Sequence, residues 1–197
     1  HRFSDRLGHL DLAAQWNRCA QLIGDADWIW FVPDDDLPSP DCVKEILENV
    51  TIADKVGANV IHVPCITIDH QGQKLNSRDE WPNVIGSADF YLRQLKGEAS
   101  GVTLGNTIYR RTAFETAGRF VSFPRGWGSD HATTLSVAGG GPVVTVQKAW
   151  LDFRMSCENI SSMSHDATEK LQAKLLFASW LAQKTLEWYG PEVAREL

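Results

Sequence analysis

The chain has 197 residues, a formal net charge of −6 at pH 7, 43% hydrophobic residues and 22% charged residues. This composition is ordinary for a globular protein, and the length suits one domain with a substantial core. The acidic balance argues against a nucleic-acid partner, which would call for a basic surface. No apolar run reaches the length of about 18 residues expected of a membrane-spanning helix.

The four cysteines are widely spaced and form no Cys-x-x-Cys pair. Such isolated cysteines are typical of reduced thiols in a reducing compartment, so we expect a cytoplasmic protein without disulfides or a zinc site. They are Cys19, Cys42, Cys65 and Cys157.

In chain order, helically spaced apolar residues predict a helix over residues 10–23, and an apolar run predicts a strand over 27–33. Ser39, followed by Pro40, is typical of a helix start. That helix should run to about residue 53, with its buried face formed by Val43, Ile46, Leu47 and Val50.

Strands and helices continue to alternate along the rest of the chain. The alternation predicts one α/β domain over residues 1–197, with a mainly parallel sheet flanked by helices. A strand over 101–109, returning after a long excursion, is the candidate for an antiparallel strand at the end of the sheet. The further predicted elements are strands over 58–68, 101–109 and 142–153 and helices over 84–96, 110–117, 131–138 and 166–188. The stripe of the last helix, along Leu171, Leu175, Ala178 and Ala182, is expected to cover the core.

Three carboxylates, Asp34, Asp35 and Asp36, follow the apolar strand directly. Ligands of open α/β sheets sit at the carboxyl ends of strands. If the segment stays extended, the side chains of Asp34 and Asp36 point together and can hold a hard divalent cation with a substrate's phosphates. The simpler interpretation is a solvated acidic turn.

Asp130 stands at a predicted helix start, within the segment Trp127 to His131. Free amides at a helix start stabilise a carboxylate, and such a group can still act as a base toward a hydroxyl. The simpler interpretation is an ordinary helix cap. Trp127 is a candidate platform for a sugar ring. Arg154, in the polar loop after the last strand, is a candidate partner of a diphosphate or else neutralises a neighbouring acid.

Taken together and in this order, these clusters resemble the family-2 glycosyltransferases, inverting enzymes of the GT-A fold. The resemblance covers about residues 3–162 and departs from the family at Ser129, where the family has Glu. The segments that carry it are Arg6-Leu7-Gly8 with Asn17, Trp28 to Asp36 with its Asp-x-Asp ending, Pro40-Asp41, Gly118-Arg119-Phe120, Ser129-Asp130, and Arg154 with Asn159-Ile160-Ser161.

The resemblance implies a GT-A-like, Rossmann-like sheet, a nucleotide-sugar donor, a saccharide or other hydroxyl acceptor, and Mn²⁺ or Mg²⁺. It implies that Asp130 is the general base. Asp34, Asp35 and Arg154 would contact the nucleotide, and Asp34 and Asp36 the metal. Trp127, Ser129 and His131 would contact the acceptor, and His165 is a further candidate metal ligand.

The family has roughly sixty residues, about two βαβ units, before the segment that matches Arg6. Those residues form its first strand and part of the nucleobase pocket, so we expect this chain to lack the N-terminal part of such a domain.

Two other functions remain open from the sequence. A metal-dependent phosphohydrolase of the haloacid dehalogenase type also places Asp-x-Asp after an apolar strand. Its site normally continues into Gly-Thr, whereas Leu37 and Pro38 follow here. The other alternative is a non-catalytic, truncated transferase-like module that binds a partner. Turnover of a nucleotide sugar separates the enzyme from the module.

Overall fold

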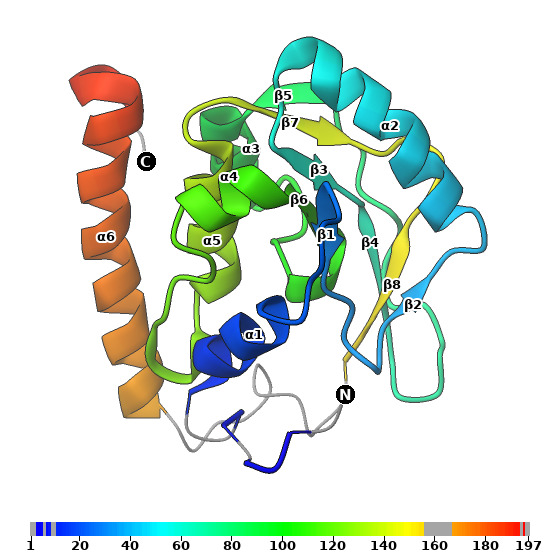
Figure 1. The fold of residues 1–197 in the computed structure, drawn as a ribbon, viewed down its shortest axis with the longest axis horizontal. Coiled ribbons are helices and arrows are strands. Elements are labelled where there is room, and N and C mark those ends of the chain that lie inside the picture. The colour runs from blue at the N-terminus through cyan, green and yellow to red at the C-terminus, as the bar shows by residue number, and fades with distance from the viewer. Residues whose placement is uncertain (1–2, 6, 9–10, 156–166, 194, 196–197) are drawn as a thin grey trace.

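The computed structural model describes residues 3–5, 7–8, 11–155, 167–193 and 195. Within these residues the strands form two sheets, of order β1-β6-β3-β7-β5 and β2-β8-β4 (Figure 1). The strands are β1 (Trp28–Trp30), β2 (Leu37–Pro38), β3 (Val60–His62), β4 (Cys65–Ile68), β5 (Val84–Gly86), β6 (Thr107–Arg110), β7 (Pro142–Thr145) and β8 (Leu151–Arg154). The helices are α1 (Leu12–Ala20), α2 (Cys42–Val56), α3 (Ser87–Leu95), α4 (Arg111–Thr116), α5 (Ser129–Ala138) and α6 (Ala167–Val193), with short 3₁₀ helices η1 (Leu104–Asn106) and η2 (Pro124–Gly126).

The fold is a mixed α/β fold, but the expected mainly parallel sheet is wrong. Only β3 with β7 and β4 with β8 pair in parallel within the described residues, and the other strand pairs are antiparallel. The reason lies in β6, which inserts between β1 and β3 and runs opposite to both. The returning strand is therefore antiparallel as anticipated, yet it lies inside the sheet, between β1 and β3, and not at its end.

The two faces of the larger sheet are both buried, because successive side chains of a strand point to opposite sides. Val60 and Tyr109 pack into a core cluster with Phe114 and Phe120, on the side of α1 and α4. Their neighbours Ile61 and Ile108 pack into a second cluster with α2. The sheet is thus a central layer with helices on both faces (Figure 1).

The buried face of α2 differs from the predicted one. Val43 and Leu47 are 59% and 65% exposed, whereas Cys42 and Ala53 are fully buried. Small side chains let the helix backbone approach the close-packed sheet, and that approach turns the larger apolar residues outward. Ile46 keeps its predicted place in the core.

The expected core stripe of α6 is also wrong. Leu171 and Leu175 are 59% and 64% exposed, and the helix packs through Ala173, Phe177 and Leu181 instead. The sequence offers two apolar stripes on this helix, and aromatic side chains bury more area than Ala or Leu. The stripe that contains Phe177 therefore faces the domain, and α6 stands along its side (Figure 1).

Candidate active site

A cleft of about 590 Å³ lies where the segment after β1 meets the start of α5. Its lining combines two of the predicted clusters, Asp34, Asp35 and Asp36 from one segment and Trp127, Asp130 and His131 from the other. A larger hollow of about 650 Å³ lies between α4, α5 and α6, and none of the predicted site residues lines it. The concentration of carboxylates makes the smaller cleft the candidate active site.

The acidic segment is a turn, not the extended continuation of a strand. β1 ends at Trp30, and a turn forms at residues 34–35. The side chains of Asp34 and Asp36 therefore differ in burial, although both line the cleft. Asp34 is exposed, Asp35 is half-buried, and Asp36 is 5% exposed.

Asp36 is packed beneath the loop that precedes β6. Its Oδ1 accepts a hydrogen bond from the backbone N–H of Arg154 at 3.0 Å, and its Oδ2 is buried with no hydrogen-bond partner among the described residues. Burial raises the pKa of Asp36 to about 6, because the charged form loses hydration; the Arg154 amide opposes the shift. Asp36 therefore joins the end of β8 to the acidic turn.

Arg154 holds the backbone around the acidic turn. Its Nε donates to the carbonyl oxygen of Asp35 at 3.1 Å, and its Nη1 donates to the carbonyl oxygens of Asp69 and His70 at 3.0 and 3.3 Å. These bonds fasten the acidic turn to the segment after β4. The predicted contact of Arg154 with a diphosphate stays a prediction, and the observed bonds give this residue a supporting task.

The start of α5 places Asp130 and Ser129 in different surroundings. Asp130 is the second residue of α5 and lines the cleft. Ser129 is fully buried, and its Oγ accepts the N–H of Phe123 at 3.2 Å. Thus Ser129 ties η2 to α5, and its predicted contact with an acceptor would require it to leave this bond.

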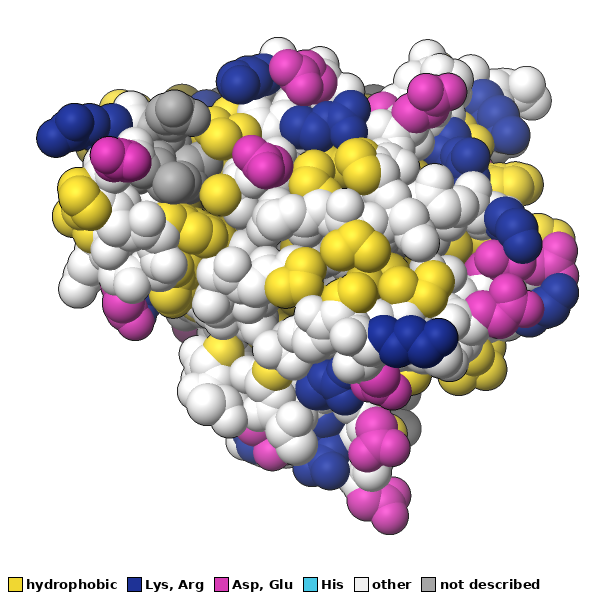
Figure 2. Space-filling view, turned by 90° about the horizontal axis from the view of Figure 1, so that it is seen from above, with side chains coloured by type: hydrophobic (Ala, Val, Ile, Leu, Met, Phe, Trp, Pro, Cys, Tyr) yellow, Lys and Arg dark blue, Asp and Glu magenta, His cyan; other side chains and the backbone are white. Residues whose placement is uncertain are grey.

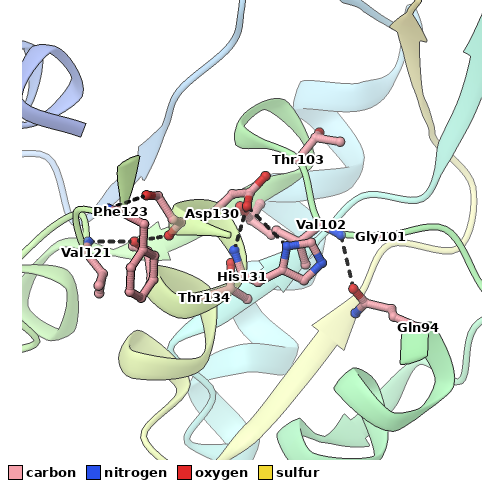
Figure 3. A network of polar contacts seen from close by, with 12 residues as sticks. Gln94, Gly101, Val102, Thr103, Val121, Phe123, Asp130, His131 and Thr134 are labelled. Atoms are coloured by element: carbon pink, nitrogen blue, oxygen red, sulfur yellow. Dashed lines mark hydrogen bonds and ion pairs between the residues drawn. The ribbon is translucent and has the colours of Figure 1, made fainter. Parts of the chain in front are cut away.

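His131 and Trp127 both line the cleft. His131 Nδ1 lies 3.1 Å from Asp130 Oδ1 (Figure 3). The Trp127 ring has Lys170 Nζ 4.0 Å from its centroid, a cation–π contact that fixes one end of α6 against the cleft. One face of the Trp127 ring is thereby taken, so an acceptor sugar would need the other face.

The loop around Val102 and Thr103 also lines the cleft, and sequence reasoning missed it. A glycine stands on each side of it. A Cβ on Gly105 would lie 2.8 Å from Asp36 Oδ2, and a Cβ on Gly101 would lie 3.3 Å from His131 Nε2. Glycines inside a strand-like pattern indicate close backbone approach. This was the available signal, since each glycine marks the point where the loop meets a site residue.

Metal ligands were predicted from the sequence. Among the described residues, no group of three or more His, Cys, Asp or Glu side chains is arranged to hold a metal ion. His165, the Asn159-Ile160-Ser161 motif and Cys157 lie outside the described residues. Cys19, Cys42 and Cys65 are free thiols. Within the described helices, no stretch has the length and apolar character needed to cross a membrane.

The site and the mixed α/β fold can be set beside known proteins. No protein-family model and no curated protein matches this sequence. Among solved structures, the chain is similar to the crystal structure of S. aureus TarS residues 1–349, a family-2 glycosyltransferase of the GT-A fold, with a TM-score of 0.48 and 12% sequence identity. The match covers 90% of this chain and 52% of the solved TarS chain, so this chain spans about half the length of that solved chain.

Proposed function

We propose that this chain transfers a sugar from a nucleotide-sugar donor to an acceptor hydroxyl, with inversion and with the help of a divalent metal. The supporting observation is the single cleft that combines the acidic turn with Asp130 at the start of α5. Inverting transfer needs two opposed functions in one cavity: oxygen ligands near the leaving diphosphate, and a base near the attacking hydroxyl.

The residues of the acidic turn fit a cation that is shared with substrate. Mg²⁺ and similar ions are commonly bound by one or two carboxylates together with substrate phosphates, so a complete protein cage is not required. All three carboxylates line the cleft, but Asp34 is exposed and Asp35 is half-buried, whereas Asp36 is buried, with Oδ1 bonded to the Arg154 amide and Oδ2 buried. We therefore assign Asp34 and Asp35 to the cation, in place of the pair Asp34 and Asp36. A cation held there would neutralise the charge that develops on the leaving diphosphate.

Asp130 receives the proton of the acceptor hydroxyl. It lies in the first turn of α5, beside the free amides of a helix start, which carry partial positive charge. The acceptor oxygen then bonds to the anomeric carbon as the bond between that carbon and the diphosphate breaks. Trp127 and His131 form the neighbouring wall, where the acceptor would bind.

The face seen in Figure 2 carries Lys and Arg interspersed with Asp and Glu. Mixed charge of this kind is not the single-sign field that a nucleic acid would require. The partners proposed are therefore a nucleotide-sugar donor and a hydroxyl acceptor.

The free thiols of Cys19, Cys42 and Cys65 support a reducing compartment, the cytoplasm.

Calorimetric titration of UDP, GDP and dTDP, each with and without Mn²⁺, tests the donor half of the proposal. One of them should bind in the presence of Mn²⁺, and Asp35→Asn should weaken that binding about tenfold or more, equal to at least 1.4 kcal/mol. Asp25→Asn is the control, because it makes the same change at an exposed aspartate that does not line the cleft.

Three results would overturn the proposal. Nucleotide binding that is equally tight with and without Mn²⁺ would refute the proposed role of a cation in donor binding. Binding of a nucleotide without any hydrolysis or transfer from the matching nucleotide sugar would favour a non-catalytic binding module. Release of phosphate from a simple phosphomonoester would favour the phosphohydrolase.

A further inference from the structure

Asp130 and His131 are neighbours in sequence that are joined twice in space. The backbone N–H of His131 lies 2.9 Å from Asp130 Oδ1, and the ring Nδ1 lies 3.1 Å from the same oxygen (Figure 3). A carboxylate can only accept, so the ring Nδ1 carries the hydrogen of the second bond. Both bonds end on Oδ1, and among the described residues no bond engages Oδ2. The free oxygen is the one left for an acceptor hydroxyl.

Three separate segments hold the His131 ring in this orientation. Tyr91 of α3 meets it edge-on with ring centroids 5.9 Å apart, and Phe177 of α6 meets it edge-on at 6.3 Å. The loop at Gly101 closes the remaining side, where an added Cβ would lie 3.3 Å from Nε2. Because Nε2 faces this backbone, the ring presents its functional nitrogen, Nδ1, to Asp130.

We propose that His131 is the positioning residue of Asp130, a role that rests on the function proposed above. The Nδ1–H bond and the backbone N–H bond fix Oδ1, and this leaves Oδ2 aimed at the acceptor. In the transfer step the hydroxyl proton passes to Asp130 Oδ2, the acceptor oxygen bonds to the anomeric carbon, and the diphosphate leaves with the electron pair of the broken bond. His131 keeps its own proton throughout.

Two substitutions separate the nitrogens of the ring. The side-chain amide of Asn reaches the place of Nδ1, and that of Gln reaches the place of Nε2. His131→Gln should lower kcat about 10- to 100-fold with an unchanged KM for the donor, because a misplaced catalytic group costs up to about 10²-fold. His131→Asn should retain most of kcat. The double variant with Asp130→Asn should lose no more than Asp130→Asn alone, since the two residues act as a unit.

Gly101→Ala serves as the control for packing. It presses on the ring from the Nε2 side and leaves the Nδ1 bond in place, so a role limited to packing would make its kcat loss equal to that of His131→Gln. Equal kcat for the Asn and Gln variants at position 131 would likewise overturn the positioning role.

A readout that needs no turnover keeps the two proposals apart. The ¹⁵N spectrum of the His131 ring should show a proton on Nδ1 in the wild type, and Asp130→Asn should change the Nδ1 resonance. A neutral ring protonated on Nε2 instead would overturn the positioning role even in an active enzyme. A wild type that turns over no nucleotide sugar but shows the Nδ1 proton would overturn the function and leave the Asp130–His131 pair as a structural contact.

Discussion

The two acidic regions of the cleft differ in how their carboxylates are held. Asp36 also lines the cleft but is only 5% exposed, with one oxygen bonded to the Arg154 amide and the other packed beneath Gly105. Asp130 is held at one oxygen by His131 and lines the open cleft. The comparison teaches that an acid within an Asp-x-Asp pattern can be buried by its surroundings, while an acid at a helix start can keep one oxygen available to the cleft.

The largest expected effect is on turnover and concerns Asp130, the carboxylate of the proposed base. Asp130→Asn should lower turnover of the nucleotide sugar about 10²- to 10⁴-fold, the usual contribution of a positioned base. Donor binding by calorimetry and the free energy of unfolding should stay close to the wild type, because this side chain is only half-buried. Turnover within threefold of the Asp25→Asn control would move the base elsewhere.

The second prediction concerns the pH dependence of stability at Asp36. Its pKa is raised to about 6, so the folded state binds the proton more tightly than the unfolded chain does. This stabilising contribution is full below the ordinary value of 3.8 and is lost as the pH rises through about 6. Over that window the wild type should lose up to about 3 kcal/mol, at 1.36 kcal/mol per pKa unit.

Asp36→Asn lacks the titrating proton and is the reference for this loss. Urea unfolding of both proteins in EDTA, from pH 4 to pH 7, measures the difference in the free energy of unfolding. As the pH rises, the free energy of unfolding of Asp36→Asn should increase relative to that of the wild type. A difference that does not change with pH would show that Asp36 has an ordinary pKa.

The smallest expected effect compares the two glycines of the cleft loop. An added Cβ at Gly105 would lie 2.8–2.9 Å from Asp36, Leu151 and Pro33, in a packed region. Gly105→Ala should therefore destabilise the fold by about 1–3 kcal/mol. Gly101→Ala meets only the end of the His131 ring at 3.3 Å and should cost less. Thermal unfolding of the two variants measures how far each one is destabilised. Equal destabilisation would refute the idea that packing is more rigid at Gly105 than at Gly101.

The sequence alone determined the elements that local chemistry controls. Ser39 and Pro40 indicated the beginning of α2 to within three residues, although Asp41 and not Ser39 occupies the N-cap position and the Ser39 hydroxyl accepts the N–H of Trp150 instead. The apolar run before the acids indicated β1, because hydrophobic patterning acts over a few residues. The alternation of Val60 with Ile61 on opposite faces of the sheet follows from the same local rule. Asp34, Asp35 and Asp130 were selected from the sequence for the same reason: each follows a recognisable strand end or helix start.

Only the tertiary structure decided how these elements meet. The insertion of β6 between β1 and β3 made the sheet mostly antiparallel, and strand pairing over such distances is not visible in local patterns. Helix α6 has two apolar stripes, and only the packing of Phe177 against the core decided which of them faces the domain. Asp36 became enclosed because β8 and the loop at Gly105 close over it. Burial, which affects both the pKa and the accessibility of a side chain, depends on contacts between segments far apart in the chain. For this reason the sequence identified the acids, whereas only the fold decided how accessible each one is.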